Sequence, residues 1–142
     1  MKVRQLSIFL ENRVGRLAGV AQLLGEAGIS IRALSVADTN DFGILRLLVD
    51  DIVKAEEHLR RNNVVCRINN VTVVAVDNRP GGLAKVLTVL NQAAVNIEYM
   101  YAVAESSNQR PLLVFRFTEG EAAVAALKKA DIKIINEEQL FA

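Results

Sequence analysis

The 142-residue sequence contains one cysteine, one histidine and no tryptophan. A single cysteine, Cys66, excludes an internal disulfide and is typical of proteins from a reducing compartment. One cysteine and one histidine cannot build a metal site from soft ligands, so we expect no metal and no cofactor. Nothing in the sequence marks a base beside a serine or the cysteine, as an activated nucleophile would need. The sequence therefore predicts no catalytic residues and a protein that is not an enzyme.

The sequence also lacks a long apolar run and an excess of charge of one sign. Its apolar stretches are far shorter than a membrane span, and Met1 leads into charged residues without a signal-type region. Residues 1–70 carry ten Lys or Arg and eight Asp or Glu, and residues 71–142 carry seven and eight. Neither half has the basic surface of a nucleic-acid-binding protein. We expect a cytoplasmic protein whose partners include neither a membrane nor nucleic acid.

What the sequence does contain is an internal repeat. A shift of 66 residues aligns ENRVGRLA at 11–18 with DNRPGGLA at 77–84, and nine of 21 positions from Glu11 to Ile31 are identical. Chance would give roughly one or two identities at average residue usage. An internal repeat indicates that the same structural unit occurs twice. We therefore predict two modules, residues 1–69 and 70–142.

Each copy follows the order strand, helix, strand, strand, helix, strand. Strands are predicted where apolar and polar residues alternate, and helices where apolar residues recur every three or four positions. Asp50 or Asp51 is expected to cap the second helix, and Thr118 with Glu121 to form a capping box on the fourth. The order predicts an α+β protein with two ferredoxin-like βαββαβ sandwiches in tandem, whose antiparallel sheets carry helices on one face. The predicted strands are 3–10, 29–37, 44–49 and 64–68 in the first copy, and 71–76, 96–104, 112–117 and 132–135 in the second.

The repeated turn lies where the first strand of each copy meets the first helix. A helix start leaves backbone N–H groups without partners and carries a partial positive charge, which suits a carboxylate. Gly15 and Gly81 would let a ligand approach the backbone, and Gly82 would open the second site further. Glu11 and Asp77 could accept an ammonium group. The turn therefore suits a free α-amino acid, and the alternative is that its residues only shape the turn and cap the helix.

The second copy resembles the ACT domain, a small regulatory module of amino-acid metabolism, in the string Asp77-Asn78-Arg79-Pro80-Gly81-Gly82-Leu83 followed by a helix and Asn96-Ile97. The first copy matches less strictly, with Glu11 for Asp, Val14 for Pro and Ser30-Ile31 for Asn-Ile. The resemblance covers nearly the whole chain and implies ligand sites between the first turn of one module and the second strand of its neighbour. The implied ligand-binding residues are Asp77, Asn78, Pro80, Gly81, Asn96 and Ile97 in the second copy, and Glu11, Asn12, Gly15, Ser30 and Ile31 in the first.

The sheet faces turned away from the helices indicate association between modules. In the second copy this face is predicted to be apolar, so it needs cover from the first module's sheet or from a second chain, unless a bulge shifts the face. Sheet edges also invite pairing, and we expect a homodimer. The residues predicted on that face are Val71, Val73, Tyr99, Tyr101, Leu112 and Val114.

Together these features predict a non-catalytic regulatory protein that binds a free amino acid at ACT–ACT interfaces and signals to a partner enzyme of amino-acid metabolism. One alternative is a regulatory subunit that resembles the small subunit of acetohydroxyacid synthase. A tandem-ACT regulator similar to the glycine cleavage repressor is another. A small enzyme on a ferredoxin-like scaffold would need clustered His, Cys or carboxylate side chains, which the sequence does not show, and a pure assembly module stays open.

Overall fold

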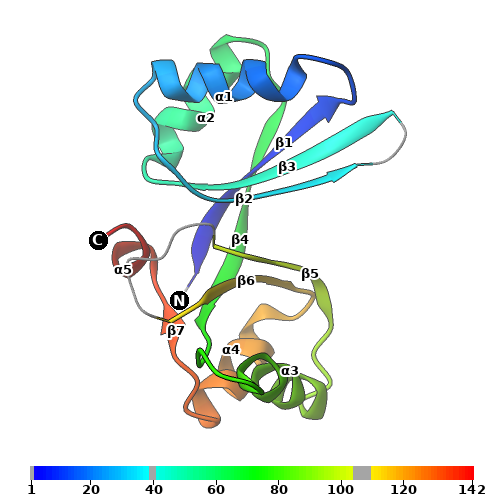
Figure 1. Ribbon diagram of the computed structural model, residues 1–142, viewed down its shortest axis with the longest axis vertical. Helices are drawn as coiled ribbons and strands as arrows, with labels where there is room; N and C mark the ends of the chain where they lie inside the picture. The colour runs from blue at the N-terminus through cyan, green and yellow to red at the C-terminus, as the bar shows by residue number, and fades with distance from the viewer. Residues whose placement is uncertain (1, 39–40, 104–109) are drawn as a thin grey trace. The chain divides into compact units, whose positions relative to one another are not determined.

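The computed structural model describes residues 2–38, 41–103 and 110–142. Its internal contacts divide the chain into an N-terminal unit, Arg4–Asn69, and a C-terminal unit, Met1–Val3 with Asn70–Ala142. In both units two helices cover one face of an antiparallel sheet (Figure 1). The predicted fold class, two βαββαβ sandwiches in tandem, is confirmed. Within the described ranges, none of the helices has the length and apolar character to cross a membrane.

The N-terminal unit is built around the strand order β2-β3-β1. Its antiparallel register pairs Ile8 of β1 with Leu45 of β3. Leu6, Leu24 and Leu59 are buried between this sheet and the two helices. As predicted, Asp51 caps the second helix, since its carboxylate accepts a hydrogen bond from the Lys54 N–H at 3.2 Å. The elements are β1 (Val3–Glu11), α1 (Arg16–Glu26), β2 (Ile31–Asp38), β3 (Phe42–Val49), α2 (Ile52–Arg61) and the first part of β4 (Cys66–Ala75).

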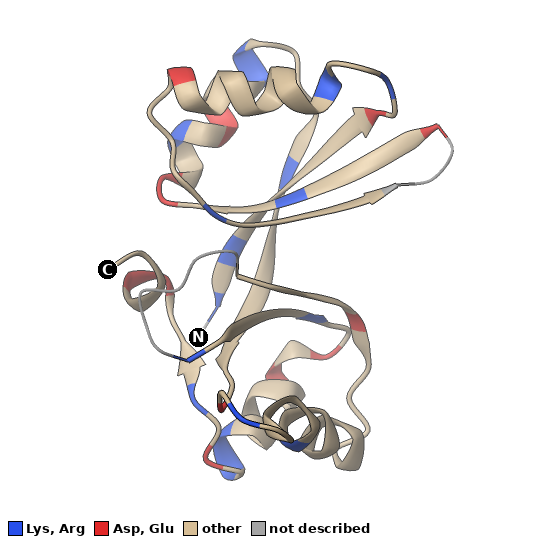
Figure 2. Ribbon diagram, in the orientation of Figure 1, with Lys and Arg blue, Asp and Glu red and all other residues tan. Residues whose placement is uncertain are grey.

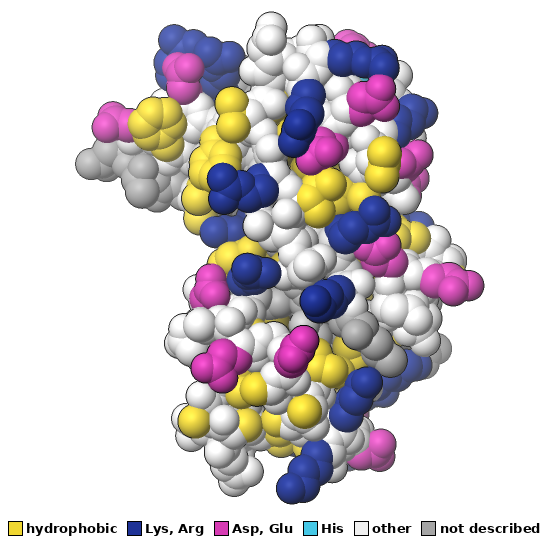
Figure 3. Space-filling view, turned by 180° about the vertical axis from the view of Figure 1, so that it is seen from behind, with side chains coloured by type: hydrophobic (Ala, Val, Ile, Leu, Met, Phe, Trp, Pro, Cys, Tyr) yellow, Lys and Arg dark blue, Asp and Glu magenta, His cyan; other side chains and the backbone are white. Residues whose placement is uncertain are grey.

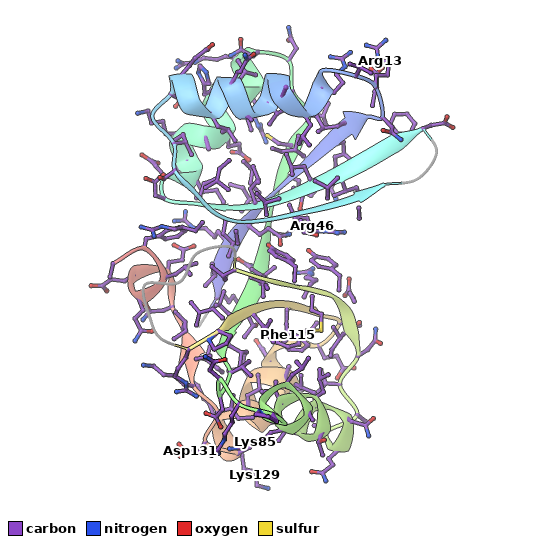
Figure 4. The ribbon with its side chains drawn as sticks, in the orientation of Figure 1. Arg13, Arg46, Lys85, Phe115, Lys129 and Asp131 are labelled. Carbon is purple, nitrogen blue, oxygen red and sulfur yellow. The ribbon has the colours of Figure 1, made fainter. Side chains whose placement is uncertain are left out.

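The C-terminal unit repeats this plan with a sheet in which β4 lies between β6 and the short β7, and β5 forms the edge. Phe115, labelled in Figure 4, is fully buried and stacks on Phe117 with 5.3 Å between ring centroids. Val74, Val86 and Leu127 complete the centre of its core. The remaining elements are α3 (Gly82–Gln92), β5 (Ile97–Ala102), β6 (Leu112–Phe117), α4 (Gly120–Lys129), β7 (Ile134–Ile135) and α5 (Glu137–Phe141).

Three local predictions differ from the structure. The strands expected at 64–68 and 71–76 are one strand, β4. At the expected join, the Asn69 side chain accepts a hydrogen bond from the Ser7 hydroxyl at 2.7 Å. The capping box at Thr118 is wrong, since Glu119 is the N-cap of α4 and makes no side-chain cap bond. The real capping box joins Asn136 and Gln139 at α5, where no helix was predicted. Residues 39 and 40, which lie between the expected strands 29–37 and 44–49, and residue 104 of the expected strand 96–104 are outside the described ranges.

Each unit has fully buried residues on the strand faces turned away from its helices. Gln5 and Ala33 are fully buried in the N-terminal unit, and so are Val73 and Val114 in the C-terminal unit. Register shifts do occur, between Ile31 and Ala33 in β2 and between Ile97 and Tyr99 in β5. The shift in β5 lies before Tyr99 and does not affect the pairing that follows. Tyr101 therefore pairs with Val114, and both lie on the face turned away from the helices, as predicted.

Candidate ligand site at the repeated turn

The two repeated turns have nearly the same backbone conformation. Gly15 and Gly81 are the N-caps of α1 and α3, with φ of 88° and 87° in the left-handed region that favours glycine. The Arg13 N–H donates to the Glu11 carbonyl at 2.8 Å, and the Arg79 N–H donates to the Asp77 carbonyl at 2.9 Å. The sequence identity of the turns therefore reflects a shared local structure.

Neither helix start is capped by a side chain at its N-cap glycine. The N–H of the first helical residue is used inside the turn, because Arg16 donates to Arg13 at 3.3 Å and Gly82 donates to Arg79 at 3.0 Å. An α-helix leaves the N–H groups of the next two residues without helical partners. A Cβ built at Gly15 or Gly81 would meet nothing within 4 Å. Each turn thus presents a bare backbone surface at a helix start, as expected for an anion receptor.

One residue of the second turn, Gly82, has a role different from that expected. Gly82 does not open the site, because a Cβ at this position would lie 2.1 Å from the Asp77 carbonyl oxygen. Its missing side chain allows the turn to close on the helix, and the residue is buried. Pro80, one of the implied ligand-binding residues, precedes the N-cap Gly81 and lies outside α3.

The acidic residues ahead of the turns are held by arginines. Glu11 pairs with Arg13 at 3.1 Å and with Arg16 at 3.4 Å. Asp77 pairs with Arg79 at 3.5 Å and with Arg110 at 3.0 Å. All these side chains are partly exposed, and such pairs contribute roughly 0–1 kcal/mol each, so a ligand can exchange them at low cost.

The second-strand residues expected at the site lie at the far end of each first helix. Helix α1 has 11 residues, which separates Gly15 from Ser30 by about 16 Å along the axis. Ser30 instead bonds Asp50, whose carboxylate accepts the Ser30 N–H at 2.9 Å. Asn96 also has a partner within its own unit, because its side-chain amide donates to the Thr118 hydroxyl at 2.9 Å. A single module therefore does not bring the two halves of the predicted site together.

In the N-terminal unit the turn borders a cavity of about 600 Å³, named here the α1 cavity. It lies between β1, the N-terminal half of α1 and the segment 62–65 that leads into β4, where the Phe9 N–H bonds the Val65 carbonyl at 3.1 Å. Figure 3 shows hydrophobic side chains beside basic and acidic ones on the N-terminal unit. Of the predicted residues the cavity gathers Glu11 and Gly15. Its other lining residues are Phe9, Leu10, Arg16, Gly19, Val20, Leu23, Phe42, Asn62, Asn63, Val64 and Val65.

The equivalent place in the C-terminal unit holds a cavity of only about 80 Å³. Asp77 and Gly82 line it together with three charged side chains, Lys85, Arg110 and Asp131. Figure 4 shows Lys85 of α3 next to Asp131, which follows α4. The space next to the turn is therefore smaller in the C-terminal unit than in the N-terminal unit, and three charged side chains line it.

Arg110 was missed by the sequence analysis, although a signal for it existed. The register pairs Ala75 with Leu112, and extending this antiparallel pairing by two residues brings Asp77 opposite Arg110. The equivalent pair in the N-terminal unit is Glu11 and Phe42. Charges are otherwise mixed on both units, as Figure 2 shows.

Comparison with known proteins gives the family. The model of the ACT domain pair matches residues 1–142. A protein of Bacteroides thetaiotaomicron with a known crystal structure is 38% identical, with 99% of this chain and 96% of that chain covered and a TM-score of 0.92. The ligand-free regulatory subunit of aspartate kinase from Thermus thermophilus is 21% identical, covers 89% of this chain and 91% of its own, and has a TM-score of 0.62. The latter likeness concerns the fold alone.

Two curated relatives are acetolactate synthase small subunits. The one from Buchnera aphidicola is 31% identical in a 94-residue alignment that covers 49% of this chain and 59% of the relative. The one from Aquifex aeolicus is 32% identical in a 94-residue alignment that covers 62% of this chain and 49% of the relative. The chain spans about half the length of these relatives. With a family model that matches from end to end, this chain belongs to the family of ACT domain pairs.

Proposed function

We propose that this ACT domain pair is a non-catalytic regulatory protein that binds a free amino acid and signals its presence to a partner enzyme of amino-acid metabolism. The observation that carries the proposal is the repeated helix start, where Gly15 and Gly81 leave bare backbone without a capping side chain. The ligand carboxylate would bind these helix starts, and its ammonium group would bind Glu11 or Asp77.

The proposed site is an ACT–ACT interface in a homodimer, where the turn of one module meets the second strand of a module from a second chain. The 11-residue helix between Gly15 and Ser30 supports this, because the two halves of the predicted site need two modules to meet. Hydrogen bonds to charged groups contribute about 1.5–3 kcal/mol each. Two or three of them, less the cost of association, correspond to roughly −4 to −8 kcal/mol, a millimolar-to-micromolar site.

A thermal-shift screen of the full chain against the twenty amino acids tests this proposal, because a ligand that binds only the folded state raises the melting temperature. We expect stabilisation by one or a few amino acids. Asp77→Asn and Glu11→Gln should each weaken it, because they remove a charge and keep the shape. Glu26→Gln, an exposed change on α1, is the matched control. Silence across all twenty at millimolar concentration would favour a pure assembly module.

The likeness to acetolactate synthase small subunits favours a second candidate, a regulatory subunit of such an enzyme. In that case the chain should co-elute with an acetolactate synthase catalytic subunit from its own organism in size-exclusion chromatography. Its addition should also change the amino-acid sensitivity of the synthase. Separate elution with unchanged enzyme kinetics would exclude this partner, while the amino-acid screen would still test the broader proposal.

A further inference from the structure

We propose that the α1 cavity is a ligand site of its own, for a small monocarboxylate with an aliphatic or aromatic tail. This site lies within one module and needs neither a second module nor an ammonium group on the ligand. It shares Glu11 and Gly15 with the interface site proposed above, but it differs in its ligand and in needing one module alone. Its volume of about 600 Å³ falls in the range of small-molecule pockets, roughly 300–1,000 Å³.

The duplication supplies the first support, because the same place can be compared in two copies. Position 19 aligns with position 85, so Gly19 stands where the C-terminal unit has Lys85. Asn63 and Asp131 both follow the second helix of their unit, with φ of 61° and 58°. At these positions the N-terminal unit has smaller or uncharged side chains where the C-terminal unit has charged ones, and the space next to them is open.

The walls of the α1 cavity indicate what would occupy it. Phe9, Phe42 and Val65 line it and are 43%, 59% and 67% exposed. Leu23 and Val64 extend the apolar surface inward. Apolar side chains that stay exposed in a concave surface are typical of a binding site, and these walls suit a hydrocarbon tail.

The charged residues at the cavity supply the polar end. Glu11 and Arg16 both line it, and their contact of 3.4 Å is longer than the 3.1 Å between Glu11 and Arg13. If Arg16 paired with the carboxylate of a ligand, Glu11 would still be paired with Arg13. Gly15 adds the partial positive charge of the α1 helix start on the same side. A ligand carboxylate that displaced Glu11 from Arg16 would therefore bind a cation next to an apolar wall.

The test measures binding of 4-methylpentanoate and 3-phenylpropanoate to the full chain by isothermal titration calorimetry at neutral pH. Their uncharged amides are the matched ligands without the carboxylate. We expect the acids to bind and the amides to bind about tenfold more weakly or worse. No binding of either acid at 10 mM, or equal binding of acids and amides, would overturn the inference.

Two pairs of variants locate the binding. Gly19→Leu fills the cavity and should abolish binding, whereas Gly25→Leu makes the same change on the same helix away from the cavity and should leave it within about twofold. Both glycines have open space at their Cβ position. Arg16→Gln should weaken binding about tenfold or more, and Arg79→Gln, the same change in the repeated turn of the C-terminal unit, should not. Retained affinity in Gly19→Leu, or equal losses in either pair, would contradict the assignment.

The outcome separates this inference from the proposed function, because the probes lack the ammonium group. If amino acids bind and the probes do not, the α1 cavity assignment fails and the interface proposal stands. If the probes bind and no amino acid does, the interface proposal fails and the α1 cavity assignment stands.

Discussion

The N-terminal and C-terminal units begin their first helices with the same backbone turn, but they differ in the space behind it. In the C-terminal unit Gly82 lets the turn close against the Asp77 carbonyl, and Lys85 and Arg110 line the small space that is left. In the N-terminal unit the corresponding position is Arg16, and the space behind the turn is about 600 Å³ against about 80 Å³. The second copy is the stricter match to the ACT motif, yet the first has the larger cavity. The match to the motif thus predicts the backbone of the turn but not the volume of the cavity next to it.

The largest difference between the units should appear on substitution of Gly82. Gly82→Ala places a Cβ 2.1 Å from a backbone oxygen, so we expect the free energy of unfolding to fall by roughly 2–4 kcal/mol. Arg16→Ala, the equivalent change, should cost at most about 1 kcal/mol because it only shortens an exposed side chain. Urea unfolding of both variants measures the contrast. Equal losses would mean that the two turns pack alike.

The N-cap glycines should give equal effects, since their backbones agree. Gly15→Ala and Gly81→Ala each force a side chain into the left-handed region, which costs roughly 1–2 kcal/mol. Thermal unfolding of the two variants checks this equality. A difference above about 1 kcal/mol would show that the turns differ in strain as well as in surroundings.

Exchange of the residues at positions 19 and 85 should have a smaller effect. Gly19→Lys meets open space on a helix, so it should stabilise the protein by up to about 1 kcal/mol. Lys85→Gly should destabilise it by about as much. Chemical denaturation of both variants tests whether the two positions are equivalent. A large loss in Gly19→Lys would contradict the open space assigned to the α1 cavity.

The smallest expected effect concerns Cys66, which only the N-terminal unit has. Burial, and then the Glu56 carboxylate, raise the pKa of its thiol. Because the folded-state pKa lies above the unfolded one, its contribution to stability is present below the unfolded pKa and is lost as the pH rises through the folded value. We therefore expect the free energy of unfolding of the wild type to fall slightly above about pH 8.5. In Cys66→Ala this fall should be smaller. Identical alkaline pH profiles for variant and wild type would refute this.

Most of the architecture could be predicted from the sequence, because the pattern of each strand and helix lies within a short segment and occurs in both copies. Alternation in 3–10 and the helical stripe from Leu17 to Leu24 each describe one element, and the second copy repeats them. The prediction failed at the joint between copies, where Asn69 is satisfied by the Ser7 hydroxyl 62 residues away. The size of the α1 cavity also depends on side chains from three distant segments. No local pattern reports how such segments pack.

The most direct measurement of the central claim is a ¹H–¹⁵N correlation spectrum of the full chain, titrated with the amino acid that gives the largest thermal shift. The account predicts that the backbone N–H signals of Gly15 or Gly81 move on saturation, together with those of the residues that follow. The signals of Gly25 and Gly120, which lie away from the turns, should stay in place. If the ligand binds and both turn glycines stay unchanged, the repeated turn is not the amino-acid site.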